Sequence, residues 1–476
     1  MGLLTVITNN IKAASGVQQD FATLLENEDV SRALNIMHDH SVKAAEYLKE
    51  YNVNTHKVVT ERKDKPIYDK NGNYLRLQKK WKIPIPYQEF INEIALVFLY
   101  GRPVKWSQES EDTDEAYQKF KETLTEVRFD SAVREAKRLA GAEGSSAILY
   151  HVYKDEKNQP KLLLNVLSKS NNDEIYVLKD QYKRLKAFAW GYYLSEAGGK
   201  SVYHVDIYTA NSIYECKRGS VGWDVEKKVN LIGKIPALIF EQEPEHKNVQ
   251  PMIERVETKT SVDADVNDRF ANPAMVATTE VLNSLPKQEE EAKLYILKDG
   301  GEIKYLTWNE ASQSKNDEYE RLDKHILSKS FTPNIDFDNM KSLSNISGKA
   351  LKQMMMLAVI KAEKRKETHD GYMSRASNLL KAILGNVLDY KNKSKYEALV
   401  VTHEFQEPFG EDVSAVLNDL LAQYEAGALS QETLLEKSYL VKNVQLELER
   451  LQEDQTKAME RQRELNTMEM FSPRAE

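Results

Sequence analysis

The sequence contains a single cysteine, Cys216, and no long apolar run. One cysteine excludes an internal disulfide framework and is typical of a reducing cytosol. No stretch approaches the ~20 consecutive apolar residues that a membrane span needs. Residues 1–16 carry an early apolar patch but no basic start, long apolar core or small-residue cleavage site, so we expect no signal peptide. These absences favour a protein assembled in the cytoplasm without a membrane partner.

Clustered positive charge is also scarce. The 476 residues include 66 Lys and Arg against 74 Asp and Glu, which gives a net charge of -8. Non-specific nucleic-acid binders hold phosphates with clustered Lys and Arg, so this balance argues against a general nucleic-acid binder and predicts that the chain tends to repel DNA. The length predicts two to four domains, and 41% hydrophobic residues are enough for sizeable cores.

No catalytic or cofactor motif is complete. Gly198-Gly199-Lys200-Ser201 is similar to the end of a phosphate-binding loop, but the motif needs a glycine at position 194, which is Leu, so we expect a surface turn. His38 and His40 point to different faces of a helix, and His403 lacks the second histidine of a zinc-binding helix. We therefore predict no metal, no cofactor and no catalytic residue.

The first 250 residues combine two hydrophobic periods. Helical spacing predicts helices over Asp29–Tyr51, Tyr87–Tyr100 and Asp130–Ala142, while Lys57–Lys82 is strand-like with a turn at Asn71-Gly72-Asn73. From Ser146 onward the period is two. The predicted strands are Ser146–Lys154, Lys161–Leu167, Ile175–Leu178, Ala187–Leu194, Val202–Thr209, Ser212–Lys217 and Ala237–Phe240. The fold class is therefore α+β, predominantly helical.

Two charge-rich helices follow, over Glu254–Phe270 and Asn316–Lys329. Their apolar stripes are too narrow for a monomer core, so neighbouring helices must support them. The first helix carries the carboxylates Glu254, Glu257, Asp263, Asp265 and Asp268. Between the helices, Leu294–Leu297 and Ile303–Leu306 flank Asp299-Gly300-Gly301, which predicts a hairpin because Asp-Gly and Gly-Gly adopt positive φ at low cost.

The segment Ser330–Met356 is a polar loop that runs into a long helical pattern. Ser347 can cap a helix from Gly348 to about Leu384, roughly 55 Å long at ~1.5 Å per residue. The loop has few packing anchors, so we expect it to move. A strand over Ala398–Phe405 and helices over Asp412–Ala426, Ser430–Lys437 and Asn443–Glu464 complete the pattern. Such an arrangement is more typical of a ring around an aqueous channel than of a compact monomer.

In this order the segments resemble the portal proteins of tailed, long-tailed-type bacteriophages. Ala95–Pro103 is similar to the family's helix with a Gly-x-Pro break, and Pro251–Phe270, followed by Ala271-Asn272-Pro273, is similar to its first stem helix. The most specific match is Ser330–Leu351, whose end N-I-S-G-K-A-L resembles the tunnel loop and the start of the long wing helix. Gly427–Glu449 is similar to the helix pair that leads into the crown.

The resemblance implies a division of the chain into the parts of a portal protein. These are a wing of N-terminal helices and antiparallel strands (1–250), a first stem helix (251–271), a clip with a hairpin (272–311), a second stem helix (312–331), a tunnel loop (332–347), a long wing helix with a returning strand (348–410), and a helical crown with a polar tail (411–476).

The resemblance also implies a dodecameric ring at one capsid vertex of the virion, through which double-stranded DNA is packaged and ejected. Its partners would be further copies of the chain, the terminase large subunit, head–tail connector proteins, and the major capsid and scaffolding proteins. The expected DNA-facing tunnel-loop residues are Ile335, Asp336, Asp338, Asn339, Met340, Lys341 and Ser344. The expected channel-lining stem acids are Glu257, Asp263, Asp265 and Asp268, and the clip hairpin is Asp299, Gly300 and Gly301.

Two other functions remain open on the sequence alone. Paired carboxylates can hold Mg²⁺, so Glu257, Asp263 and Asp265 could belong to a metal-dependent nuclease. The spacing of Asp263, Asp265 and Asp268 does not place all three on one helix face, which weighs against this alternative. The long helix could instead be the partner surface of a cytoplasmic helical scaffold protein.

Overall fold

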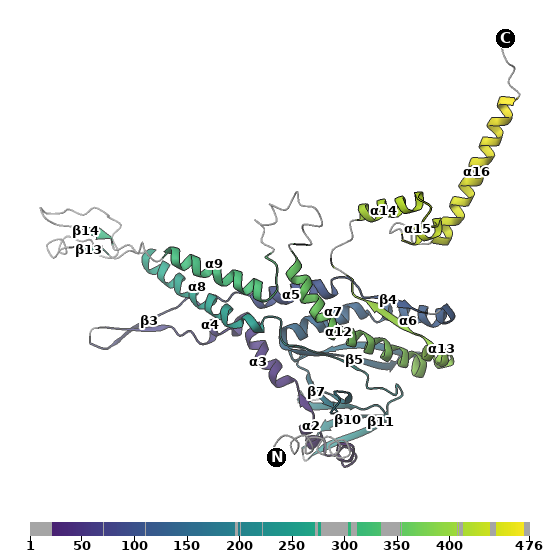
Figure 1. Cartoon of the computed structure of the whole chain (residues 1–476). Helices are drawn as coiled ribbons and strands as arrows, with labels where there is room; N and C mark the ends of the chain where they lie inside the picture. The colour runs from purple at the N-terminus through teal and green to yellow at the C-terminus, as the bar shows by residue number, and fades with distance from the viewer. Residues whose placement is uncertain are drawn as a thin grey trace, which may run out of the picture. The chain divides into compact units, whose positions relative to one another are not determined.

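The computed structural model describes residues 21–69, 71–109, 111–195, 199, 201–220, 222–271, 275–277, 303–305, 312–334, 353, 355–406, 408, 413–437 and 444–470. These residues form two compact units, one up to residue 408 and one from residue 413 onward (Figure 1). Within the described ranges, the helices are all too short or too polar to cross a membrane.

The first unit is mixed α/β. Its helices are α2 (Val30–Ile36), α3 (Ser41–Tyr51), α4 (Lys57–Thr60), α5 (Tyr87–Tyr100), α6 (Asp114–Glu126), α7 (Phe129–Glu143), α8 (Gln250–Ala271), α9 (Ser312–Lys329), α12 (Met356–Ile383) and α13 (Lys393–Ala398). Its strands are β1 (His38–Asp39), β2 (Lys65–Tyr68), β3 (Tyr74–Gln78), β4 (Lys105–Gln108), β5 (Ser145–Lys154), β6 (Pro160–Leu167), β7 (Glu174–Lys179), β8 (Leu185–Ser195), β9 (Ser201–Tyr208), β10 (Ser212–Arg218), β11 (Trp223–Val229), β12 (Ala237–Glu241), β13 (Met275–Ala277), β14 (Ile303–Tyr305) and β15 (Val401–Glu404). The seven strands predicted after Ser146 are confirmed as β5 to β10 and β12.

Two antiparallel sheets stack in the centre of this unit. One has the strand order β1-β7-β8-β9-β10-β11 and the other has the order β12-β5-β6. Strand alternation decides which layer each side chain enters. On β8, Phe188 packs toward the three-stranded sheet, whereas Ala187 and Ala189 pack toward α2. On β5, Ile148 faces α5, α7 and α12. The layers are therefore helices, small sheet, large sheet and α2.

One predicted helix is wrong. Instead of a single helix over Asp29–Tyr51, the chain forms α2, then the short strand β1, then α3. His38 and Asp39 pair with Val177 and Tyr176 of β7. The Asp39 carboxylate also accepts a hydrogen bond from Ser41 N at 2.7 Å, which starts α3. A long-range strand pairing overrides the helical period here.

The start predicted for the long helix, Gly348, falls within residues 335–352, which lie outside the described residues, and it stays a prediction. Among the described residues the long helix is α12, which begins at Met356 after Met355 with φ of -88° and ψ of 8°. With 28 residues, α12 measures about 42 Å. It continues into one turn of π-helix at Leu384–Leu388.

The second unit is helical. It consists of α14 (Val413–Glu425), α15 (Gln431–Lys437) and α16 (Val444–Met470), which confirms the three helices predicted for this region. Gly427 has a φ of +73°, a conformation that favours glycine, and it separates α14 from α15. The crown assignment of residues 411–476 stays a prediction.

Candidate functional site

The two charge-rich helices predicted from the sequence are α8 and α9, and they pack against each other in antiparallel fashion (Figure 1). At the end nearer the sheets, Ile253 and Val256 of α8 and Ile326 of α9 form a fully buried apolar cluster with Ile91 of α5. The part of each helix's narrow apolar stripe that is buried in this cluster spans about two turns. The far end must therefore be held in another way.

Ion pairs also join α8 and α9, from Arg255 beside the apolar cluster to Asp263 further along α8. Glu318 accepts from Lys259 at 2.9 Å and from Arg255 at 3.0 Å, and Lys315 lies 2.8 Å from Asp263. Hydrogen bonds from Lys259 and Arg255 hold the pKa of the Glu318 carboxyl below its ordinary value. The predicted support from a neighbour is thus supplied within one chain, by charge as well as by apolar packing.

The other side of α8 holds an extended segment, residues 80–85, which we call the anchor strand. Its backbone N–H groups donate to side chains of α8. Ile85 N donates to Glu257 Oε1 at 2.8 Å, Ile83 N to Ser261 Oγ at 2.9 Å, and Trp81 N to Asp265 Oδ1 at 2.9 Å. The three hydrogen bonds form a ladder between a helix and a strand.

The ladder follows from the two backbone geometries. Glu257, Ser261 and Asp265 are four residues apart, so they lie on one face of α8 at a rise of about 6.0 Å per step. Alternate residues of an extended strand advance about 6.6 Å and point their N–H groups to the same side. The two spacings are close enough for three consecutive hydrogen bonds.

Two prolines alternate with two of the donors. Pro84 lies between Ile83 and Ile85, and Pro86 follows Ile85 just beyond the anchor strand, whereas Lys82 lies between Trp81 and Ile83. At these two positions a backbone N–H group would point away from α8 and would have no acceptor there. Proline has no backbone N–H, so no donor is left unsatisfied. The sequence W-K-I-P-I-P thus suits an extended segment outside the β-strands that is hydrogen-bonded along one edge.

Of the predicted stem acids, Glu257 is buried. Its side chain is 1% exposed and accepts from His56 Nδ1 at 2.6 Å, in addition to the bond from Ile85. A carboxylate in this position cannot line a channel, so we remove it from the proposed channel-facing set. Its partners come from α4 and the anchor strand, about 200 residues earlier, which is why the acidic helix alone did not reveal its burial.

The other stem acids lie nearer the surface. Asp263 pairs with Lys315, and Asp268 is exposed and accepts from Trp81 Nε1. Asp265 is 11% exposed and is contacted by Arg62 at 2.5 Å and Lys80 at 3.1 Å. Burial would raise the pKa of Asp265, but hydrogen bonds from Trp81 N, Lys80 and Arg62 lower it.

The nuclease alternative finds no geometric support in these contacts. Glu257, Asp263 and Asp265 each contact a different basic side chain from a different segment, namely His56, Lys315 and Arg62. Metal-bound carboxylates converge on one ion instead. Among the described residues, no group of three or more His, Cys, Asp or Glu side chains is arranged to hold a metal.

The predicted tunnel loop and clip hairpin lie outside the described residues. This applies to all the tunnel-loop residues from Ile335 to Ser344 and to Asp299, Gly300 and Gly301. Of the region between α8 and α9, the structure describes β13 and β14, which pair antiparallel with Met275 opposite Tyr305. The roles of the tunnel loop and of the clip hairpin stay predictions.

A buried ionic node lies where the tunnel loop is expected to leave and re-enter the body. Glu245, 0% exposed, accepts from Lys137 of α7 at 2.6 Å and from Lys361 and Arg365 of α12 at 3.0 and 3.1 Å. Lys361 also donates to Ser330 O, just after α9, at 3.0 Å. Lys361 thereby joins the residue before the expected loop to the helix after it.

Burial alone would raise the pKa of Glu245, but the charges of Lys137, Lys361 and Arg365 hold it well below its ordinary value. This ionic cluster around Glu245 was not predicted from the sequence. One signal was present, because Lys137 follows Val133 and Ala136 and precedes Ala140 in the apolar stripe of α7. A lysine inside such a stripe indicates a buried acidic partner.

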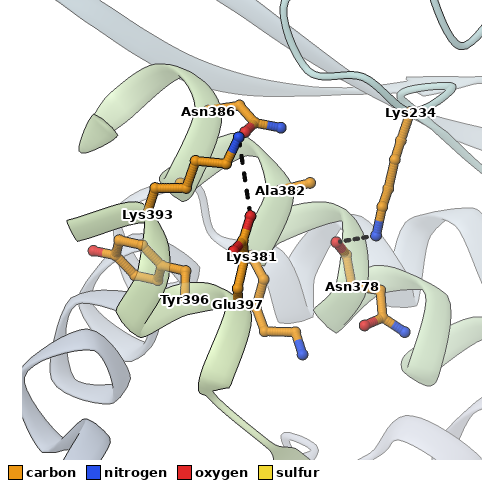
Figure 2. A pocket seen from close by; sticks show the side chains of 9 residues that line it. Lys234, Asn378, Lys381, Ala382, Asn386, Lys393, Tyr396 and Glu397 are labelled. Carbon is orange, nitrogen blue, oxygen red and sulfur yellow. Dashed lines mark hydrogen bonds and ion pairs between the residues drawn. The ribbon is translucent and has the colours of Figure 1, made fainter. Parts of the chain in front are cut away.

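A pocket beside the π-helical turn is lined by Lys234, Lys381 and Lys393 (Figure 2). Its volume is about 280 Å³. The ammonium groups do not converge, because Lys234 donates to Asn378 O at 3.2 Å, Lys381 to Leu399 O at 2.9 Å, and Lys393 lies 3.9 Å from Glu397. Each lysine has its own acceptor, so this pocket offers no concentrated charge to an anion.

The ladder yields a direct prediction. Replacing Ser261, which is 0% exposed, by alanine leaves Ile83 N without its acceptor and should lower the free energy of unfolding by about 1–2 kcal/mol. Thr260→Ala is the matched control, because that hydroxyl only donates to Val256 O of its own helix, and it should change stability by less than about 0.5 kcal/mol. Urea unfolding followed by circular dichroism measures both. Equal effects of the two variants would contradict the ladder.

Comparison with known proteins gives one family and several distant structures. The family model described as "Phage portal protein, SPP1 Gp6-like" matches residues 34–461. No curated protein matches the chain. One similar solved structure is the neck of an empty GTA particle computed with C6 symmetry, with 9% identity, a TM-score of 0.38, and coverage of 74% of this chain and 88% of that chain. Another is the neck of a native GTA particle computed with C12 symmetry, with 11% identity, a TM-score of 0.38, and coverage of 74% and 89%. A third is the virion of a native gene transfer agent (GTA) particle, with 10% identity, a TM-score of 0.34, and coverage of 74% and 88%.

Proposed function

The chain belongs to the SPP1 Gp6-like family of phage portal proteins, and from this premise we propose that it forms the ring through which DNA enters and leaves one vertex of a phage capsid. The match over residues 34–461, from the N-terminal helices to the C-terminal helix, is the observation that carries the proposal. The ring would be a homododecamer and a component of the virion. It would bind the terminase large subunit during packaging and head–tail connector proteins afterwards, with capsid and scaffolding proteins around it.

The α8–α9 pair fits the task of a stem. It is tied to the body by the apolar cluster and the ladder, and ion pairs join its two helices to each other. A subunit that carries two such helices can place them beside those of the next subunit, and a head-to-tail interface closes into a ring if its rotation closes. The stem helices of all subunits would then form the wall of the channel, with the clip, 272–311, at their far end.

For the channel wall we keep Asp263 and Asp268 as proposed residues, and we remove Asp265 because it lies with Glu257 on the face of α8 that the anchor strand covers. Carboxylates facing DNA would repel phosphates and keep the duplex from sticking. The Lys315 ammonium lies 2.8 Å from Asp263 in the subunit, so the repulsion of DNA by Asp263 would be weaker than that by a free carboxylate. The proposed wall is thus mildly rather than strongly acidic.

Electron microscopy of the purified full chain, combined with native mass spectrometry, tests the ring. We expect top views of a closed ring with a central channel and a mass equal to a whole number of subunits. A strict monomer under all solution conditions, together with no ring in particles, would overturn the proposal.

The tunnel loop carries a separate prediction. Deleting Asp338–Lys341 should impair DNA packaging while ring assembly stays intact, because the expected loop faces the duplex and not the subunit interface. Nuclease-protected DNA per particle measures packaging, and electron microscopy measures assembly. Replacing the same four residues with Gly and Ser keeps the loop length and separates loss of side chains from shortening. Wild-type packaging by the deletion variant would show that the loop assignment is wrong.

A further inference from the structure

A hairpin that carries exposed apolar side chains projects from the first unit near α8 (Figure 1). We define the arm as residues 62–80, which include β2, the Asn71-Gly72-Asn73 turn and β3. Asp69 closes the turn by accepting from Asn71 N and Asn73 N, each at 2.8 Å, and Gly72 has a φ of +86°. The arm is therefore a defined ribbon rather than a loose loop.

Exposed apolar side chains gather on both strands of the arm. Pro66 is opposite Leu77 and Tyr68 is opposite Tyr74 in the register, and Leu75 lies between these pairs at a bulge. The exposed fractions of Tyr68, Tyr74, Leu75 and Leu77 are 56%, 59%, 59% and 50%. Large apolar side chains gathered in this way on a monomer surface indicate an interaction site. A two-stranded ribbon is also marginally stable alone, so cover on one face would strengthen it.

The base of the arm is held firmly. Arg62 at its start and Lys80 at its end both contact Asp265 of α8, and Lys80 N donates to Asp64 Oδ1 at 2.9 Å. The anchor strand then continues from the arm along the ladder. The arm is thus fixed in direction with respect to α8, and a partner bound to it would be positioned against the stem.

The arm is the basic part of an acidic chain. It has seven Lys and Arg against two Asp, a net charge of +5, whereas the whole chain carries -8, so the rest carries -13. The rest of another copy therefore has the opposite sign and attracts the arm. DNA would also attract the cations, but exposed leucines serve no purpose in phosphate contact.

We propose that the arm docks on a second copy of this chain, with its exposed apolar side chains packed against the neighbouring subunit and its cations facing acidic surface there. This inference rests on the proposed function, because in a ring each subunit extends its arm to the next, and the contact is head-to-tail. The arm then gains cover for its leucines only on assembly.

The test uses the full chain with Leu75→Asp and Leu77→Asp together. Both side chains are at least half exposed in the subunit, so circular dichroism melting of the unassembled subunit, recorded at low protein concentration, should be unchanged. The concentration at which half the protein is assembled, measured by native mass spectrometry, should rise at least about tenfold, because two apolar contacts worth over ~1.4 kcal/mol in total are lost. The matched control is Tyr182→Asp, whose side chain is 70% exposed outside the arm, and it should assemble as the wild type does.

Charge is tested separately with Arg76→Glu and Lys79→Glu. This variant should also assemble less well, and the salt sensitivity of assembly should fall, since screening would no longer weaken an attraction. If the wild type itself never assembles, the proposed ring fails. If the arm variants form rings as readily as the wild type, the arm proposal is wrong and the ring stands. Rings of normal stability that have lost binding to a double-stranded DNA probe would assign the arm to nucleic acid and overturn the proposal.

Discussion

Replacing Glu245 by alanine is expected to lower the free energy of unfolding by about 3–5 kcal/mol. The loss is large because the Lys137 ammonium, 0% exposed, would lie in the interior without its carboxylate, and Lys361 and Arg365 would lose the same partner. Leaving a buried charge unpaired costs much more than an exposed pair is worth. Urea unfolding followed by tryptophan fluorescence measures the effect.

The matched control is Glu243→Ala, two residues earlier. Glu243 is 67% exposed and pairs with Lys247 at 2.6 Å, so its loss should cost less than about 1 kcal/mol. A double variant, Lys137→Met with Glu245→Leu, should recover part of the loss because both charges leave the interior together. An effect of Glu245→Ala no larger than that of Glu243→Ala would contradict the buried node.

The pH dependence of this difference has a definite sign. The pKa of Glu245 in the folded chain lies well below its ordinary value of 4.5, so the folded state favours the carboxylate. The stabilisation is fully present above about pH 4.5 and is lost as the pH falls through the lower, folded-state value. The gap in stability between the wild type and Glu245→Ala should therefore be constant from pH 6 to 8 and should narrow in acid.

The second large effect is expected for Glu257→Ala. This change removes the acceptor of both His56 Nδ1 and Ile85 N from a site that is 1% exposed, and it should cost about 3–4 kcal/mol. Glu254→Ala, one turn earlier on α8, is the control, because Glu254 pairs with Lys57 at a more exposed position and should cost less than about 1 kcal/mol. Thermal melting compares the two.

A double-mutant cycle isolates the pair. His56→Ala, Glu257→Ala and the combination of both should show a coupling of about 1–3 kcal/mol, the range for residues in direct contact. A coupling near zero would mean that Glu257 acts through Ile85 alone. In that case the ladder, rather than the histidine, holds this end of α8.

Helices and strands were predicted correctly where residues close in sequence determine them. The helix Tyr87–Tyr100 is found with the predicted bounds because Pro86 precedes it and Gly101 follows it. The strands after Ser146 are confirmed because successive side chains of an antiparallel strand enter different layers, which gives these short apolar and aromatic segments their period of two. Asp29–Tyr51 failed because β1 pairs with a strand about 140 residues away, which no local pattern reports.

In the candidate site, too, the features set by local sequence were predictable, whereas those set by distant residues were not. That α8 and α9 are helices with little apolar surface was predictable from composition. That Glu257 is buried was not, because its partners His56 and Ile85 lie far away in sequence. The i, i+4 spacing of Glu257, Ser261 and Asp265 and the alternating prolines at 84 and 86 are the local signals that together could have indicated the ladder.

The ladder between α8 and the anchor strand cannot be long. Each step along the helix falls short of the step along the strand by about 0.6 Å, so the error reaches about 1.2 Å over the three bonds seen and would reach nearly 2 Å with a fourth. The sequence ends the ladder at the same limit: the next helix positions are Ile253 and Arg269, neither of which can accept a hydrogen bond from a backbone N–H. The number of consecutive hydrogen bonds between a helix and an extended segment is thus limited by the difference between their repeat distances. Here that stretch is three bonds, enough to fix the register of α8 against the body while leaving its far end to bind other partners.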